Sequence, residues 1–224
     1  MSTAAPARTE ETKRSKGRSV AVRIVITVIA LLVWFWTQSM IGGRKFGSAG
    51  IGDGLHTWLA PLNSYLSGHV RTANLLLIAS SAIIDLLGIF LLGSWILGRS
   101  LRPFLGLVIL LGLRQVMQAL VALPAPPSAI WHYPGFPSLL VTYGVANDYF
   151  FSGHTAIAVF ATTELARLKI RWVTATAWMI VAFEIVTVLA LRAHYTMDVF
   201  TGLVAALWVA GLLDRIAPSL DRHI

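Results

Sequence analysis

The sequence contains no cysteine and only ten acidic residues among its 224 positions. Without cysteine there is no disulfide, no thiolate nucleophile and no Cys-ligated metal. Charged residues make up 12% of the chain, half of the ~25% that is usual in soluble domains. Apolar residues make up 56%, which excludes disorder for most of the chain because disorder needs low hydrophobicity. The composition therefore favours a membrane domain over a water-soluble globule.

The apolar residues gather in six runs, each near the roughly 20 residues that a membrane-spanning helix requires. The predicted spans cover residues 19–40, 73–97, 101–123, 149–168, 172–191 and 195–213. Leu and Trp recur at helical spacing over 55–66, which predicts a short interfacial helix. We predict an all-α, polytopic membrane protein with six transmembrane helices. Its parts are a disordered basic cytoplasmic tail (1–18), a membrane domain that carries the site (19–215) and a short cytoplasmic tail (216–224).

The positions of Lys and Arg predict the orientation of the chain in the membrane. Cytoplasmic loops carry an excess of these residues. Most of the 18 fall at one set of helix ends when the N-terminus is placed in the cytoplasm, whereas the Pro-rich loop 124–148 has none. We therefore predict that both termini are cytoplasmic and that this loop is extracytoplasmic. The basic excess is then a topology signal, and no nucleic-acid partner is expected.

Two polar clusters interrupt the apolar pattern at the predicted outer ends of the fourth and sixth spans. One is Asn-Asp-Tyr-Phe-Phe-Ser-Gly-His-Thr at 147–155, and the other is Arg-Ala-His-Tyr-Thr-Met-Asp at 192–198. Ionisable groups in membrane spans are costly and usually mark function. Because both clusters lie at the same predicted depth, we expect them to face each other and to form a site on the extracytoplasmic or lumenal side.

The residue types in these clusters suit phosphoryl transfer. His194 and Asp198 share one helix face, so the carboxylate can fix the imidazole tautomer and leave the other nitrogen as a base or nucleophile. Ser152 and Gly153 open a helix, whose free backbone N–H groups suit a phosphate. His154 can protonate a leaving oxygen. Two histidines with opposite roles predict a covalent transfer cycle that needs neither metal nor cofactor.

These motifs resemble those of the type 2 phosphatidic acid phosphatase superfamily, and their residues are most similar to its sphingomyelin synthase-like branch. The carrying residues are 147–155, the His-Tyr-Thr-Met-Asp-Val run at 194–199, and Arg114 ahead of Leu-Pro-Ala-Pro at 123–126. The resemblance covers about 55–215 and implies a phosphatidic acid phosphatase-like helix bundle. The superfamily's first motif is missing, since the dipeptide Arg102-Pro103 lies at the opposite, cytoplasmic end.

The resemblance implies roles for three residues. His194 would attack the phosphorus of a phospholipid, Asp198 would hold it, and His154 would protonate the departing diacylglycerol oxygen and then activate an acceptor. A lipid alcohol such as ceramide as acceptor makes a phosphotransferase, whereas water makes a lipid phosphate phosphatase or a phospholipase C-type hydrolase. The alternative of another class is a non-catalytic lipid-binding membrane protein. The expected partners are phospholipid and lipid-alcohol substrates, and self-association into an oligomer is left open.

Six further residues are weaker candidates. Arg114 is deep for a snorkelling side chain and is expected to bind phosphate. Arg192, beside His194, binds either phosphate or lipid head groups. Tyr195 either takes part in substrate binding or is an interface residue at the start of a helix. Asp148 is either a helix N-cap or a site residue. Asp85 and Glu184 either contact Arg114 or orient a histidine, or each is a protonated carboxyl that makes one interhelical bond.

Overall fold

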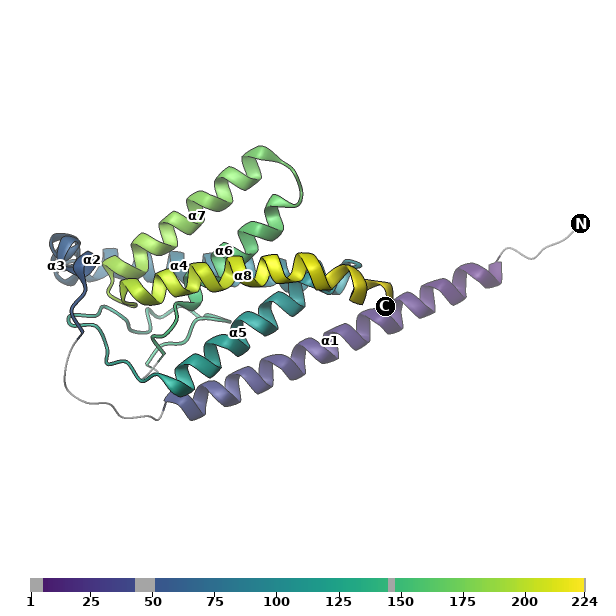
Figure 1. Ribbon diagram of the computed structural model, residues 1–224, viewed down its shortest axis with the longest axis horizontal. Helices are drawn as coiled ribbons and strands as arrows, with labels where there is room; N and C mark the ends of the chain where they lie inside the picture. Colours follow the sequence, from purple (N-terminus) through teal and green to yellow (C-terminus); the bar gives the residue numbers. More distant parts are fainter. Residues whose placement is uncertain (1–5, 43–50, 145–147, 224) are drawn as a thin grey trace, which may run out of the picture.

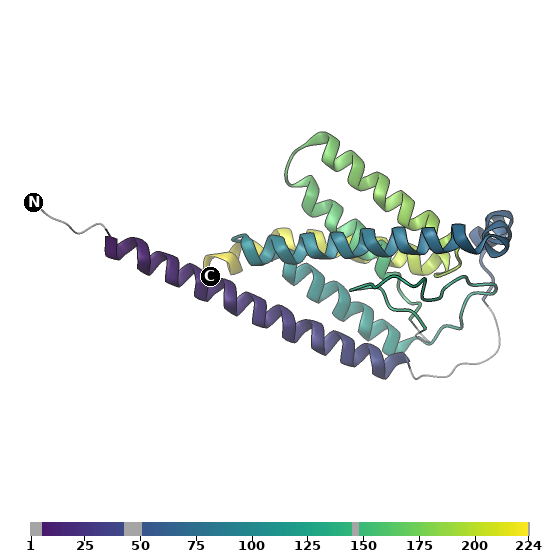
Figure 2. The ribbon, with the colours of Figure 1, turned by 180° about the vertical axis from the view of Figure 1, so that it is seen from behind.

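The computed structural model describes residues 6–42, 51–144 and 148–223, and within them it contains helices and no strand (Figures 1 and 2). Between α5 and α6, residues 121–144 and 148–152 form no helix. The helices are α1 (Pro6–Gly42), α2 (Gly54–Trp58), α3 (Ala60–Gly68), α4 (Val70–Leu97), α5 (Arg102–Leu120), α6 (Gly153–Ala166), α7 (Arg171–Ala190), α8 (Thr196–Leu220) and the 3-10 turn η1 (Asp221–His223).

Five of these helices, α1, α4, α5, α7 and α8, are long and apolar enough to cross a membrane. The chain is therefore an integral membrane protein, but the prediction of six spans is not confirmed. The run expected over 149–168 forms α6, which has only 14 residues and measures about 21 Å at 1.5 Å per residue, less than the ~30 Å hydrocarbon core. The helix begins late because Ser152 caps it, and the residues before Ser152 belong to the loop.

The short helix α6 is the centre of the bundle. Every residue from His154 to Thr162 is buried, and α4, α5, α7 and α8 all pack against it. The start of α6 also touches α8 closely. The N–H of Ser152 donates to the carbonyl of Asp198 at 3.0 Å, and a Cβ on Gly202 would lie 2.6 Å from the Ser152 carbonyl oxygen. Only glycine therefore permits this approach of the two backbones.

Helix α1 is the outermost helix and lies along α4 and α5 (Figures 1 and 2). Only 11% of its apolar window, Val20–Met40, is buried, against 39–44% for the other four spans. The structure carries this helix back to Pro6, through residues for which the sequence predicts a disordered tail. Lys, Arg and Glu are good helix formers, so the apolar span extends upstream without a break.

The bundle has two different ends (Figure 1). One end carries the first turns of α1, the last turns of α8 and the α4–α5 and α6–α7 connections. There Arg102 forms a buried ion pair with Glu164 at 2.6 Å and a partly exposed one with Asp214 at 2.8 Å, and these join α5, α6 and α8. The other end carries α2, α3, the long loop and the α7–α8 turn. Both termini thus lie at the end opposite to the loop, as the predicted topology requires.

Candidate functional site

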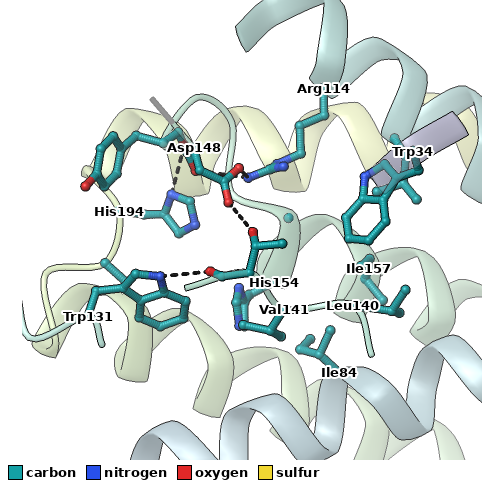
Figure 3. Close-up of a pocket in the computed structure, with 15 residues that line it drawn as sticks. Trp34, Ile84, Arg114, Trp131, Leu140, Val141, Asp148, His154, Ile157 and His194 are labelled. Atoms are coloured by element: carbon teal, nitrogen blue, oxygen red, sulfur yellow. Dashed lines mark hydrogen bonds and ion pairs between the residues drawn. The ribbon is translucent and has the colours of Figure 1, made fainter. Parts of the chain in front are cut away.

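A cavity lies at the loop end, where α5, the start of α6, the long loop and the α7–α8 turn meet (Figure 3). Its polar lining consists mainly of Arg114, Asp148, His154 and His194. The space open to the centres of water molecules is about 40 Å³. Since one water needs roughly 10–15 Å³ by this measure, the cavity has room for a phosphate group but not for a whole lipid.

The two predicted histidines line this cavity from different elements. His154 stands in the first turn of α6, and His194 stands in the turn between α7 and α8. Their ring centroids are 6.3 Å apart, a separation that one phosphate group can bridge. His154 is buried, and its Nε2 has no hydrogen-bond partner among the described residues. The ring of Trp131 packs edge-on against it at 5.3 Å.

The orientation of His194 comes from a backbone carbonyl. Nδ1 of His194 lies 2.8 Å from the carbonyl oxygen of Tyr149, and because a carbonyl only accepts, Nδ1 carries the proton. Nε2 is then the nitrogen with a free lone pair. Asp198 is farther away, with Oδ2 3.7 Å from Nδ1, and the same oxygen accepts the Tyr195 N–H at 2.8 Å. Asp198 is fully buried, and its Oδ1 has no partner among the described residues.

Arg114 is clamped by the loop. Its Nε donates to the carbonyl of Phe151 at 2.8 Å, and Nη2 donates to the carbonyl of Asp148 at 3.0 Å and forms an ion pair with its carboxylate. The Asp148 carboxylate also accepts from Gln118 and Thr142, each at 2.6 Å. Burial opposes ionisation of this carboxylate, but the Arg114 guanidinium and the Thr142 hydroxyl hold the pKa of Asp148 below its ordinary value. Asp148 thus fixes Arg114 at the cavity.

The start of α6 adds backbone donors to the same cavity. Ser152 is the N-cap, because its Oγ accepts from the Thr155 N–H at 3.3 Å. This assigns the cap to Ser152 and removes the N-cap alternative for Asp148. Gly153 lines the cavity, and a Cβ there would come within 3.3 Å of Arg114 Nε. The free N–H groups and positive dipole end of the helix therefore lie beside the guanidinium, an arrangement suited to an anion.

Arg192 and Tyr195 lie in the α7–α8 turn but do not line the cavity. Arg192 donates to the carbonyl of Pro127 at 2.8 Å and to that of His56 at 3.2 Å. The Tyr195 hydroxyl donates to the carbonyl of Pro124 at 3.2 Å. Both side chains hold the long loop against the turn that carries His194, so their position does not support direct phosphate binding.

Asp85 and Glu184 also lie apart from the histidines. The Asp85 carboxylate accepts the backbone N–H groups of Leu139 and Leu140 at 2.8 and 2.9 Å, which fixes the loop to α4. Glu184 is buried in α7 and accepts from the Ser80 hydroxyl of α4 at 2.6 Å, which is the interhelical bond of the alternative prediction. In the described part of the chain, no three His, Asp or Glu side chains form a set that could hold a metal ion.

Sequence reasoning missed a contact that we call the α2 latch, formed by Asp53 and His56. His56 Nε2 lies 2.9 Å from the carbonyl of His194, and the Asp53 carboxylate accepts from both the N–H and the hydroxyl of Thr196 at 2.6 Å. Burial opposes ionisation, but the bonds from Thr196 lower the pKa of Asp53. The latch therefore holds the backbone at His194 and two residues after it. The only signal in the sequence is an Asp before a short helix, which predicts an N-cap and not a distant partner.

A family model described as AtPDCT1/2 matches residues 54–215, more than two thirds of the chain. This is the phosphatidylcholine:diacylglycerol cholinephosphotransferase family, which is related to the sphingomyelin synthases. The match corrects the assignment to the sphingomyelin synthase-like branch, because short histidine motifs report a type of chemistry and not the acceptor lipid. It agrees with a lipid phosphotransferase in general. No curated protein and no solved structure matches the chain.

Proposed function

Because the chain belongs to the AtPDCT1/2 family, we propose that it transfers phosphocholine from phosphatidylcholine to the free hydroxyl of a diacylglycerol. The observation that carries this proposal is the pair of histidines whose rings lie 6.3 Å apart across a cavity of phosphate size. Arg114 and the start of α6 lie at the same cavity and supply positive charge. This arrangement supports the proposal because it offers candidates for a nucleophile, a proton carrier and an anion site at one cavity.

In the first half-reaction, Nε2 of His194 attacks the phosphorus of phosphatidylcholine. The bond between phosphorus and the glycerol oxygen breaks, and His154 gives its proton to that oxygen, so that diacylglycerol leaves. The product is a phosphocholine group bound to Nε2 of His194. A phosphodiester beside His154 favours the protonated imidazole that this step needs, since the phosphodiester anion and the imidazolium cation stabilise each other.

In the second half-reaction, the hydroxyl of a new diacylglycerol gives its proton to His154 and attacks the phosphorus. The bond between phosphorus and Nε2 breaks, phosphatidylcholine forms, and His194 is again neutral. Both half-reactions have the same form because the leaving group and the acceptor are the same kind of alcohol. His154 therefore alternates between acid and base, and the proton that it gives in one half it recovers in the other.

The surrounding residues stabilise charge as it develops. The proton on Nδ1 stays with the Tyr149 carbonyl at 2.8 Å, while the buried carboxylate of Asp198 at 3.7 Å favours the positive charge of a phosphorylated imidazole. Arg114 and the N–H groups at the start of α6 face the phosphoryl oxygens. Asp148 holds Arg114 in place before the reaction. Groups held in this way stabilise the transition state without the cost of rearrangement.

The test uses the full chain in lipid nanodiscs with head-group-labelled phosphatidylcholine and a diacylglycerol of distinguishable acyl composition. We expect label to appear in phosphatidylcholine that contains the new acyl chains. His194→Ala abolishes this transfer, and His154→Ala slows it by about 10²–10⁴-fold. His69→Ala is the matched control, because His69 is exposed and its ring packs on Tyr65, away from the cavity.

A second substrate separates the two histidine roles. p-Nitrophenylphosphocholine has a leaving group that needs no proton, so it restores nitrophenol release in His154→Ala but not in His194→Ala. Unchanged transfer in His194→Ala contradicts the mechanism. Release of free phosphocholine that does not depend on diacylglycerol contradicts the transferase and supports a hydrolase.

A further inference from the structure

A groove lies on the membrane-facing side of the phosphate-sized cavity, between α1, α4 and α5. From α1 it is lined by Thr27, Ala30, Leu31 and Trp34, and from α5 by four apolar residues between Phe104 and Leu111. All three helices are candidate spans, so the groove lies at the depth of the hydrocarbon. Its length along α1 is about 10 Å for seven residues at 1.5 Å per residue, which suits a segment of an extended hydrocarbon chain.

The groove adjoins the cavity, because the two share part of their wall. Trp34, Leu111 and Leu140 line both of them. In Figure 3, Asp148 and His194 lie at one side of the cavity and Trp34, Ile157 and Leu140 lie at the other, with the guanidinium of Arg114 and the ring of His154 between the two sides. The polarity therefore changes along one path, from charged groups to hydrocarbon, in the same order as along a glycerophospholipid from its phosphate to its acyl chain.

The residue at the junction supports a lipid occupant. Trp34 is 8% exposed, and its indole N–H has no hydrogen-bond partner among the described residues. A buried N–H without an acceptor is costly, and the ester carbonyl that joins each acyl chain to glycerol is an acceptor. This carbonyl lies between phosphate and chain in the lipid, as Trp34 lies between cavity and groove.

Resting on the proposed function, we infer that this groove binds an acyl chain of the glycerolipid that reacts, with Trp34 at its ester group. The donor and the acceptor in the two half-reactions are the same kind of lipid, so one groove serves both in turn. The wall formed by α1 lies outside the part of the chain that the family model matches, 54–215. The selection of acyl chains therefore depends partly on a helix that does not contribute to the phosphate chemistry.

The test compares long-chain and short-chain lipids. Ala30→Trp places a large side chain in the groove, and Ile29→Trp on the neighbouring, 54% exposed position is the matched control. The ratio of kcat/KM for dioleoyl to that for dihexanoyl lipids is measured for each. We expect Ala30→Trp to lower this ratio by at least about tenfold, since each buried methylene contributes about fourfold to binding. Ile29→Trp leaves the ratio unchanged. An unchanged ratio in folded Ala30→Trp, or an equal fall in Ile29→Trp, overturns the inference.

A measurement that does not depend on turnover separates this inference from the proposed function. Phosphatidylcholine with a diazirine in the middle of its acyl chain is photolysed with the wild-type chain, and labelled residues are mapped. We expect label at Leu31 and Leu107, and its loss in the milder variant Ala30→Leu. If Ala30→Leu is labelled as strongly as the wild type, the groove does not bind an acyl chain, whatever the result of the transfer assay. A wild-type chain that labels in this way but transfers no phosphocholine contradicts the proposed function and not the groove.

Discussion

The most informative residue is His194, because a backbone atom orients it more directly than the carboxylate that the motif suggests. The Tyr149 carbonyl accepts from Nδ1 at 2.8 Å, while Asp198 lies at 3.7 Å. Asp198 has a second task, since its Oδ2 accepts the N–H of Tyr195 and so caps α8. The Tyr149 carbonyl therefore orients His194, the Asp198 carboxylate supplies negative charge, and a mutation can remove the charge alone.

Asp198→Asn removes the negative charge but keeps an oxygen for the Tyr195 N–H. We expect kcat to fall on the order of a hundredfold, as when one stabilising polar group is lost from an active site. The midpoint of thermal unfolding changes little, because the cap is kept. Asp198→Ala, which loses both, lowers stability as well as kcat. If Asp198→Asn turns over at the wild-type rate, the carboxylate serves only the fold and the Tyr149 carbonyl alone supports His194.

The sequence allowed the ionisable members of the site to be predicted, but not their partners. His154, His194 and Arg114 stand out because charged groups are rare in apolar segments. The carbonyl of Tyr149 could not be predicted, since every residue has a carbonyl and only the folded chain selects one. Arg192 shows that a place next to a motif in sequence does not fix where a side chain points. It adjoins the motif in sequence, but the turn directs its side chain to the Pro127 and His56 carbonyls.

At the scale of elements, the site depends on how α8 meets the start of α6. The Ser152 N–H donates to the carbonyl of Asp198, so the helix that carries His154 is joined directly to the helix that follows His194. Gly202 makes this contact possible, because its missing side chain leaves room for the Ser152 carbonyl. The distance between the histidines is therefore set by backbone packing.

Gly202→Ala tests this packing. The new Cβ would lie 2.6 Å from the Ser152 oxygen, so α8 must move away from α6. We expect a loss of about 1–3 kcal/mol in unfolding free energy and a lower kcat with p-nitrophenylphosphocholine. Gly211→Ala in the same helix is the control, since nothing lies within 4 Å of its added Cβ and alanine favours a helix. Equal behaviour of the two variants contradicts the importance of the contact.

The helices were more predictable than their role. The spans predicted at 73–97, 101–123, 172–191 and 195–213 correspond to α4, α5, α7 and α8, because about 20 apolar residues in a row have few alternatives. The prediction of a sixth span at α6 is not confirmed, and hydropathy has a physical limit there. A buried inner helix is as apolar as a spanning one, so hydropathy cannot distinguish them. The aromatic residues Tyr149, Phe150 and Phe151 extend the apolar run of the sequence, but they lie before the start of α6.

At the scale of the whole molecule, the buried polar interactions gather at the two ends of the helix bundle. The loop end has the cavity and the α2 latch, while the opposite end has the ion pairs of the buried Arg102 side chain with Glu164 and Asp214. Arg23 at this end donates to the carbonyls of Trp95 and Gly98 at the C-terminus of α4. Cations at the exits of apolar helices are what the positive-inside rule counts, so this end is predicted to face the cytoplasm.

The absence of cysteine makes this topology testable with single substitutions. Ser67→Cys lies in α3 at the loop end, and Ser219→Cys lies in the last turn of α8, and both positions are exposed. In intact cells a membrane-impermeant maleimide should label Ser67→Cys at once and Ser219→Cys only after permeabilisation, while the wild type stays unlabelled. The reverse pattern would place the cavity on the cytoplasmic side. The donor phosphatidylcholine would then come from the inner leaflet, and the excess of Lys and Arg at the other end would require a different explanation.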